Sequence, residues 1–291
     1  MIVAIIGGAG RMGVWFARYF LEKGHKVIIS DVRADKAKEA AKLVNAELAE
    51  SNIEAAKKAD LVFISTPIDA TPQVLAEIIP EINKQAIVAE ITSLKSKVLP
   101  VLKMAFERGI RTLSLHPLFG FGAKRLSGEK IALIPVADPI AEKELAERIF
   151  PEATIIPVDY NLHDRVMALT LSLTHFMNII FASVISEEDI NMLKCLSGTT
   201  FTLQFILSEA VMSEDPILYA SIQMDNEYVI TYLNKLLRRA MDLKDIIENK
   251  DHNSFIRFYM ETRNSLSKDA DFARAYEKMY NALGALQCKD Y

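Results

Sequence analysis

The sequence predicts an α/β domain with a doubly wound parallel sheet, followed by an all-helical domain. Up to residue 157, short apolar runs alternate with helical patterns, as a parallel sheet covered by helices requires. Nine of the ten prolines lie in this part, and only two of the eleven glycines follow Gly128. The second part therefore has long stretches without helix breakers, which favours long helices. We predict two domains, residues 1–158 and residues 159–291.

The first strand, Ile2–Ile6, runs directly into a glycine-rich turn. Three of its glycines have the G-x-G-x-x-G spacing of the Rossmann dinucleotide-binding fold. In that fold the glycines permit a tight turn, close approach of backbone to a pyrophosphate, and close packing of helix on strand. The N–H groups and the dipole of the following helix favour the anion. The residues predicted to bind the phosphates are Gly8, Gly10, Arg11, Met12 and Gly13.

An acidic residue, Asp31, follows the second strand, Val27–Ser30. A carboxylate about twenty positions after the glycines is where the adenosine ribose of NAD is bound. Arg33 offers an alternative, because an arginine at this point can pair with the 2′-phosphate of NADP. Asp31 would repel that phosphate, so the sequence favours NAD over NADP. A glycine-rich turn that binds no nucleotide would not require Asp31.

Polar residues follow the remaining strands of the predicted sheet. The carboxyl ends of parallel strands meet at one edge, where ligands bind at the point of reversed strand order. We expect the nicotinamide end of the cofactor near the residues that follow the fourth and fifth strands, Ser65, Thr66, Pro67 and Ser93. The further elements expected in this part are a helix over Asp35–Val44 and strands over Ala46–Leu48, Leu61–Ile64, Ile87–Ile91, Thr112–Leu115, Ile131–Val136 and Thr154–Pro157, the last two as edge strands.

His116 is the strongest candidate for a catalytic group. It follows the sixth strand and begins a predicted loop, HPLFGFG, whose glycines allow close approach of a ligand. A neutral imidazole there can accept the proton of a substrate hydroxyl while hydride leaves the same carbon. The alternative is a histidine that is only hydrogen-bonded at a strand end. His175 lies eleven residues after Asp164, on the same helix face, and is either a site residue or a core histidine.

The second part of the chain is expected to contain only helices. Leu162–Ile185 has apolar residues on almost every face, which predicts a helix buried on all sides, including burial against a second subunit. The helices expected after it span Asn191–Val211, Asp215–Asn249 and Ser254–Leu283.

Composition excludes several classes of partner and site. A net charge of −4 argues against nucleic acid or an anionic membrane as the main partner. Cys195 and Cys288 are too few and too far apart for a disulfide framework or a zinc site, so no metal is expected and a reducing compartment is favoured. Met1 leads directly into the first strand without room for a signal peptide, and no apolar run reaches the length of a membrane span. We expect a cytoplasmic protein.

Six motifs occur in an order that resembles the prephenate dehydrogenase family: GGAGRMG, ISTP, ITSLKS, LHPLFG, LHDRVMALTLSLTHF and LSGTTF…SEDPILYASI. The resemblance extends over nearly the whole chain. It implies an NAD-dependent oxidative decarboxylation of prephenate to 4-hydroxyphenylpyruvate in tyrosine biosynthesis, and a homodimer formed through the helical domain. It also implies that His116 acts at the C4 hydroxyl, that Ser93 forms a hydrogen bond there, and that His175 lines the site.

One departure from the family pattern leaves the substrate open. Several members have arginines that bind a substrate carboxylate in the segment corresponding to LSGTTFTLQFILSEA, but this chain has none there. Arogenate, whose amino group changes the charge pattern, or another cyclic acid is therefore an alternative substrate. The cations that could substitute by position are Lys124, Arg125, Lys130 and Arg165.

Two other readings of the chain differ in the chemistry they need. A dehydrogenase or imine reductase of the 6-phosphogluconate type would use a lysine of the helical domain instead of His116. An NAD-binding regulatory module would keep the glycines and Asp31 but would have no need of His116.

Overall fold

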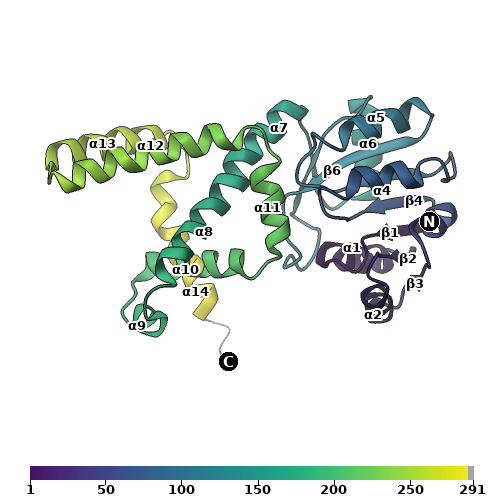
Figure 1. The fold of residues 1–291 in the computed structure, drawn as a ribbon, viewed down its shortest axis with the longest axis horizontal. Helices are drawn as coiled ribbons and strands as arrows, with labels where there is room; N and C mark the ends of the chain where they lie inside the picture. Colours follow the sequence, from purple (N-terminus) through teal and green to yellow (C-terminus); the bar gives the residue numbers. More distant parts are fainter. Residues whose placement is uncertain (288–291) are drawn as a thin grey trace. The chain divides into compact units, whose positions relative to one another are not determined.

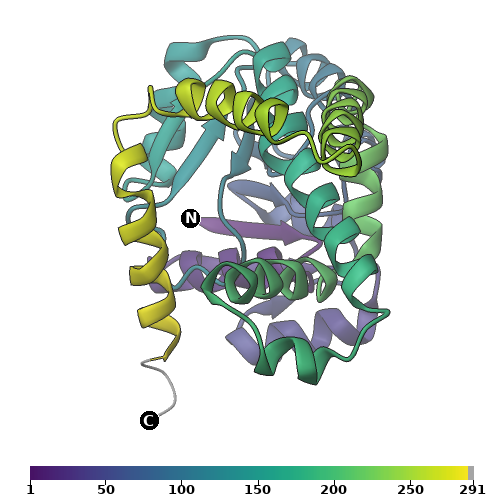
Figure 2. The same ribbon diagram turned by 90° about the vertical axis from the view of Figure 1, so that its left-hand side faces the viewer.

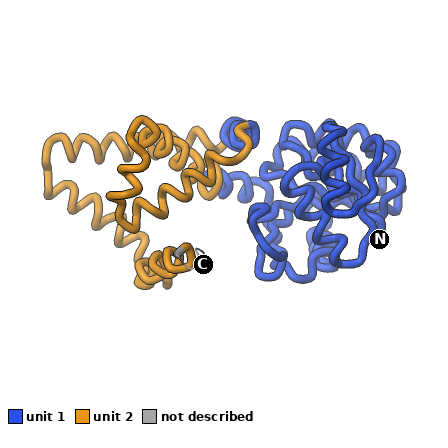
Figure 3. The backbone as a smooth tube through the Cα atoms, turned by 90° about the horizontal axis from the view of Figure 1, so that it is seen from below, with its two compact units in different colours: residues 1–168, 217–226 blue, residues 169–216, 227–291 orange. Residues whose placement is uncertain are grey.

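The computed structural model describes residues 1–287, which form two compact units (Figure 3). Unit 1 comprises residues 1–168 and 217–226, and unit 2 comprises residues 169–216 together with the described residues from 227 onward. Residues 159–168 and 217–226 thus group with the sheet. The division into domains 1–158 and 159–291 along the chain stays a prediction.

Unit 1 contains one eight-stranded sheet of order β3-β2-β1-β4-β5-β6-β7-β8. All neighbouring strands are parallel except β6 and β7, which are antiparallel. Strand order reverses between β1 and β4, so the doubly wound Rossmann-type fold predicted from the sequence is confirmed. The strands are β1 (Ile2–Ile6), β2 (Lys26–Ser30), β3 (Glu47–Leu48), β4 (Leu61–Ile64), β5 (Ile87–Glu90), β6 (Arg111–Pro117), β7 (Lys130–Leu133) and β8 (Thr154–Pro157).

Helices cover both faces of this sheet, which explains why the central strands read as continuous apolar runs (Figure 1). Alternate residues of β1 point to opposite faces: Val3 and Ile5 pack in one core cluster, and Ala4 and Ile6 pack in the other. The first cluster contains residues of α1 (Arg11–Glu22), α2 (Ala34–Val44) and α6 (Pro139–Ile149). The second contains residues of α3 (Asn52–Lys58), α4 (Thr71–Ile78) and α5 (Leu99–Glu107).

The described residues of unit 2 form helices joined by turns and contain no strand, as predicted, but the helices are shorter than expected (Figures 1 and 2). Gly198 caps α10 (Thr199–Met212) and separates it from α9 (Ile190–Cys195), and residues 267–271 interrupt the helix expected over Ser254–Leu283. The helix expected over Asp215–Asn249 is also interrupted, between α11 (Pro216–Met224) of unit 1 and α12. The helices of unit 2 are α8 (Thr174–Ile185), α9 (Ile190–Cys195), α10 (Thr199–Met212), α12 (Val229–Glu248), α13 (His252–Leu266) and α14 (Ala275–Gln287), with a short 3₁₀ turn at Phe272–Arg274.

The helical stretch Tyr160–Ile185 corrects two expectations. It consists of α7 (Tyr160–Met167), a π-helical turn (Ala168–Leu173) and α8, and only 17% of its most apolar 18-residue window is buried within the chain. The predicted burial on all sides is therefore wrong for the single chain. The window has a mean hydropathy of 1.7 over a helix of 26 residues, so a helix long and apolar enough to cross a membrane does exist. One such helix is weak evidence for a membrane span, because core helices of soluble proteins have the same composition.

Candidate active site

In the glycine-rich turn between β1 and α1, backbone atoms lie so close to the glycine Cα atoms that there is no room for side chains. Gly7 has a φ of +77°, and the N–H groups of Gly7 and Gly8 both donate to the carbonyl of Ser30 at 2.9 and 3.0 Å. A Cβ on Gly13 would lie 2.5 Å from the Gly7 carbonyl oxygen. The predicted glycines thus lie in the expected strand-turn-helix. Gly7 was missed, although the glycine pair at positions 7 and 8 was a visible signal that the turn begins one residue earlier.

The first turn of α1 fits a dinucleotide pyrophosphate. Gly10 is the N-cap residue, no side chain caps the helix, and no acidic residue lies in the first turn, which contains Arg11, Met12 and Gly13. A Cβ at Gly10 would approach only backbone carbonyl oxygens, at 3.2 Å or more. Since the first N–H groups of a helix have no partner within it, this end of α1 offers donors and a positive dipole to an anion.

Asp31 lies at the end of β2, beside this turn. Its Oδ2 accepts a hydrogen bond from the N–H of Ala9 at 3.1 Å, and its Oδ1 accepts from the N–H and Nε of Arg33 at 3.0 and 3.1 Å. The Asp31 side chain is 4% exposed, whereas that of Arg33 is 61% exposed. The structure therefore brings the carboxylate to the position expected for a ribose ligand and leaves most of the arginine in solvent.

The segment Ser65–Thr66–Pro67 after β4 packs against the same turn. A Cβ on Gly7 would lie 2.6 Å from the Ser65 carbonyl oxygen. The hydroxyl groups of Thr66 and Thr71 lie 2.8 Å apart, and the Thr71 hydroxyl donates to the Pro67 carbonyl at 2.9 Å. The predicted nucleotide residues after β1, β2 and β4 are thus brought together at the point where strand order reverses.

The loop after β6 is anchored on α1 of the nucleotide turn. The indole Nε1 of Trp15 donates to the carbonyl of Ala123 at 2.6 Å, and the rings of Trp15 and Phe119 are 5.0 Å apart. The guanidinium of Arg11 lies over the ring of Phe121, 4.6 Å from its centre. Trp15 and Arg11 of α1 therefore hold the loop that follows Pro117.

His116 lies within β6 and not in a loop after it, which corrects the expectation. β6 extends through Pro117 because it pairs with the antiparallel strand β7, where His116 is opposite Ala132. His116 is buried, and its Nδ1 lies 3.0 Å from Nε2 of His163. Burial is the main cause that holds the pKa of His116 well below its ordinary value of 6.5, and positive charge on a neighbour, His163 when protonated or the Lys95 ammonium, lowers it further.

A buried ion pair lies beside this histidine. Nζ of Lys95 is 2.8 Å from Oε1 of Glu90 and donates to the Leu115 carbonyl at 2.6 Å. Glu90 also accepts hydrogen bonds from the N–H and hydroxyl of Thr92 and from the Ser114 hydroxyl. Burial lowers the pKa of Lys95, while the Glu90 carboxylate opposes that shift. The carboxylate is well satisfied by donors, which a charge pair without solvent requires.

Sequence reasoning missed the roles of His163, Lys95 and Glu90. His163 Nδ1 is 2.7 Å from Oδ1 of Asp164, and both side chains are buried. A signal was present for the ion pair, because a glutamate ends an apolar strand and a lysine follows five residues later in a short loop. Ser93 lies in that loop after β5 and is half-buried. His175 is on α8 of unit 2, and burial lowers its pKa. The roles of Ser93 and His175 stay predictions.

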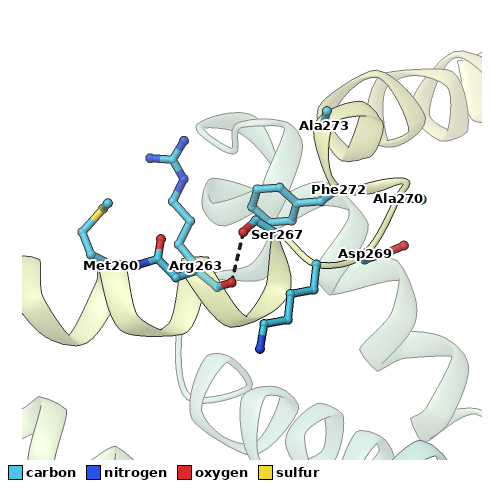
Figure 4. Close-up of a pocket in the computed structure, with 9 residues that line it drawn as sticks. Met260, Arg263, Ser267, Asp269, Ala270, Phe272 and Ala273 are labelled. Atoms are coloured by element: carbon cyan, nitrogen blue, oxygen red, sulfur yellow. Dashed lines mark hydrogen bonds between the residues drawn. The ribbon is translucent and has the colours of Figure 1, made fainter.

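Other features of the described residues do not add to this site. Nine residues between Met260 and Ala273 of unit 2, among them Arg263, Ser267 and Phe272, line a hollow of about 660 Å³ that contains no residue of the predicted site (Figure 4). Among residues 1–287, no group of three metal-ligating side chains was found. Cys195 is exposed and free, and Cys288 lies outside the described residues. The four cations proposed as carboxylate ligands, Lys124, Arg125, Lys130 and Arg165, are all exposed.

Comparison with known proteins places these observations in a family. Residues 16–138 match the family model of the prephenate dehydrogenase nucleotide-binding domain, and residues 159–261 match that of the prephenate dehydrogenase dimerization domain. A probable arogenate/prephenate dehydrogenase of Methanocaldococcus jannaschii is 27% identical over 277 residues, which cover 93% of this chain and 62% of the relative. The chain therefore spans less than two thirds of that relative's length.

Two solved structures share the fold. The crystal structure of prephenate dehydrogenase from A. aeolicus, in complex with hydroxyphenyl propionate and NAD⁺, is similar with a TM-score of 0.75 at 20% identity, over 92% of this chain and 98% of that one. The Synechocystis arogenate dehydrogenase is similar with a TM-score of 0.68 at 18% identity, over 92% and 99%.

Proposed function

Since this chain belongs to the prephenate dehydrogenase family, we propose that it catalyses the NAD-dependent oxidative decarboxylation of prephenate to 4-hydroxyphenylpyruvate. The observation that carries the proposal is His116, a buried imidazole whose lowered pKa keeps it neutral, in the sheet that also holds the nucleotide turn. A regulatory module that only binds nucleotide would not need such a group. The predicted 6-phosphogluconate-type alternative would place its base elsewhere.

The reaction assigns a defined proton transfer to His116. The imidazole accepts the proton of the C4 hydroxyl as the C4 hydrogen leaves with its electron pair. The bond between C1 and its carboxylate breaks, carbon dioxide leaves, and the electrons of that bond make the ring aromatic. The proton on His116 then returns to the phenolate oxygen. When bound, NAD supplies the acceptor for the hydride, and the first turn of α1 holds its pyrophosphate.

Asp31 supports NAD over NADP as the cofactor. Its carboxylate lies beside the glycine turn, where it can accept hydrogen bonds from both ribose hydroxyls. A 2′-phosphate would bring negative charge against this carboxylate. Arg33, the nearby cation that would have to compensate for this charge, already pairs with Asp31.

Arogenate is the second candidate substrate, and one observation favours it. Residues 196–210 contain no arginine, although several family members have arginines there for a substrate carboxylate. A substrate with an amino group beside the side-chain carboxylate needs less compensation by cations than one without it. The oxidation and loss of carbon dioxide at the ring are the same for both substrates.

We further propose that the chain forms a homodimer in the cytoplasm through its helical unit. Its match to a dimerization domain supports this, and so do the exposed apolar residues of α8, including Met177, Ile180 and Val184. Burial of such side chains against a second copy would remove them from water.

The proposed function is tested by mixing the purified protein with prephenate or arogenate and with NAD or NADP. We expect NADH absorbance to appear with NAD, together with 4-hydroxyphenylpyruvate from prephenate or tyrosine from arogenate. Tyrosine alone would assign arogenate. Binding of NAD without turnover of either compound would contradict the proposal and favour the regulatory module.

A further inference from the structure

His116, His163 and Asp164 form a continuous buried chain of polar atoms within unit 1. Nδ1 of His116 is 3.0 Å from Nε2 of His163, and Nδ1 of His163 is 2.7 Å from Oδ1 of Asp164. The two imidazole planes are inclined by 76° with centres 5.2 Å apart, so the contact joins ring edges and does not stack the faces. His116 is 6% exposed, His163 1% and Asp164 2%. Water therefore has little access to exchange the protons of this chain.

The carboxylate at one end determines which nitrogen carries each proton. An ionised carboxylate can only accept, so Nδ1 of His163 must carry its hydrogen. With His163 in its neutral form, its Nε2 is then bare and must accept from Nδ1–H of His116. The other nitrogen of His116, Nε2, is left with a lone pair. That nitrogen is the one that can take a proton from a substrate hydroxyl.

The surroundings fix the orientation of Asp164 itself. Its Oδ2 faces the backbone N–H of Lys95 at 3.4 Å, and its backbone carbonyl accepts from Nδ2 of Asn226 at 2.7 Å. The buried ammonium of Lys95 also attracts this carboxylate. The Asp164 end of this hydrogen-bonded series lies on α7. It is held in place by the loop after β5 and by the turn after α11, both in unit 1.

We propose that His163 and Asp164 are positioning residues that hold His116 in the Nδ1–H tautomer and so make its Nε2 the proton acceptor. The inference rests on the proposed function for its consequence, but the tautomer can be observed without substrate. In the proposed reaction His116 is the catalytic residue, since its Nε2 is the nitrogen of the three side chains that is left to accept the substrate proton. As His116 gains a proton, the positive charge is shared along the chain toward the carboxylate.

Asp164→Asn is the sharpest test because Lys95 dictates how the new amide lies. The Lys95 N–H needs an acceptor, so the amide oxygen faces it and the amide NH₂ faces Nδ1 of His163. Nδ1 of His163 then accepts from the amide, and its Nε2 carries the hydrogen and donates to Nδ1 of His116. The hydrogen of neutral His116 is thereby moved to its Nε2. We expect kcat to fall by about a hundredfold or more, toward the residual rate of His116→Asn, since general-base catalysis contributes about 10²–10⁴. The exposed carboxylate variant Glu144→Gln removes the same charge and should leave kcat unchanged.

The tautomer is read directly from ¹⁵N NMR of histidine-labelled protein without cofactor. The chain has five histidines, and the signals lost in His116→Asn identify those of His116. We expect a protonated Nδ1 and a bare Nε2 in the wild type, and the reverse in Asp164→Asn. A bare Nδ1 in the wild type, or a doubly protonated His163, would overturn the inference. So would an unchanged tautomer in Asp164→Asn. None of these results depends on turnover, so a failure of the proposed function remains distinguishable.

A second pair of variants covers the case in which Asp164→Asn does not fold. In His163→Gln the side-chain carbonyl can accept from Nδ1–H of His116 at the place of the lost Nε2, whereas His163→Phe provides no acceptor. We expect the glutamine variant to retain the Nδ1–H tautomer and a kcat within about tenfold of the wild type, and the phenylalanine variant to lose about a hundredfold. Equal losses in both variants, with the tautomer unchanged, would also overturn the inference.

Discussion

His116 can act as a base only while its imidazole is neutral, and its neighbours decide at which pH that holds. Burial disfavours the charged form, and positive charge nearby, on His163 when it is protonated and on Lys95, acts in the same direction. Asp164 and Glu90 are the carboxylates that pair with those two groups. The pKa of His116 is therefore lowered although two acidic residues lie in the same buried cluster.

The first prediction is a pH profile. The neutral form is active, so kcat/KM should fall as the pH drops through the lowered pKa, well below 6.5, and stay level above it. Initial rates between pH 4.5 and about 9 measure this. The double variant Lys95→Met/Glu90→Gln removes both charges of the ion pair and should move the acid limb to higher pH. An acid limb at or above 6.5 in the wild type would show that another group titrates.

The second prediction concerns Asp31. Asp31→Ala should raise the Kd for NAD by roughly tenfold and that for NADP much less, because only the unmodified ribose loses a charge-assisted hydrogen bond, worth about 1.5–3 kcal/mol. Calorimetric titration with both cofactors measures the two constants. Asp35→Ala, an exposed carboxylate of α2, is the matched control and should change neither. An equal loss for both cofactors in Asp31→Ala would mean that the ribose is held elsewhere.

Among the elements, the strands were predictable and the later helices were not. β1, β2, β4 and β5 end within one residue of expectation, because helices on both faces force apolar runs that stop at glycine or polar residues. β6 was predicted too short, since its extension through Pro117 depends on pairing with β7, a strand far along the chain. The break between Asn249 and Ser254 was predicted, whereas those at Gly198, at residues 225–228 and at residues 267–271 have weaker local signals.

The nucleotide turn and His116 were predictable because their spacing and position carry the signal. The hydrogen-bonded series His116–His163–Asp164 was not predictable from the sequence, since it depends on a contact between His116 and His163, which are 47 positions apart. The Lys95–Glu90 pair likewise forms only when the loop after β5 folds back beside β6. The sequence therefore indicated which residue we propose as the base, and the structure shows which side chains surround it.

The third prediction concerns the loop that follows β6. Trp15→Phe keeps an aromatic ring against Phe119 but removes the hydrogen bond to the Ala123 carbonyl, worth about 0.5–1.5 kcal/mol. We expect the Kd for NAD to rise several-fold as the loop loosens over the nucleotide turn, measured by calorimetric titration. Tyr19→Phe removes a hydrogen bond from the same helix to Ile149 and should lower Tm without changing that Kd. A loss of NAD affinity as large in Tyr19→Phe would contradict a specific role for the loop.

On the scale of the whole molecule, the helical unit leaves much apolar surface uncovered in the single chain. Ile180 is 47% exposed and Val184 is 63% exposed on α8. A helix with the apolar composition of a core helix whose side chains are mostly exposed in the single chain is typical of an obligate subunit interface. The proposed homodimer accounts for both facts.

The fourth prediction follows from that surface. Light scattering should give a dimer for the wild type, and Ile180→Lys should raise the dimer dissociation constant by at least about a hundredfold, since two isoleucines lose roughly 1.5 kcal/mol each. Met104→Lys, a comparably exposed residue of α5 in unit 1, is the control and should leave the dimer intact. A wild-type monomer at micromolar concentration would contradict the proposed assembly.

The contact between Trp15 and the loop after β6 has a practical consequence. Trp15 is the only tryptophan of the chain, and it lies on the first helix of the nucleotide turn. The tryptophan fluorescence of the protein therefore comes from Trp15 alone. We expect it to change when the pyrophosphate of the cofactor binds at the N-terminus of that helix. The protein carries an intrinsic optical reporter of cofactor occupancy, so titrations by fluorescence need neither a label nor a substrate.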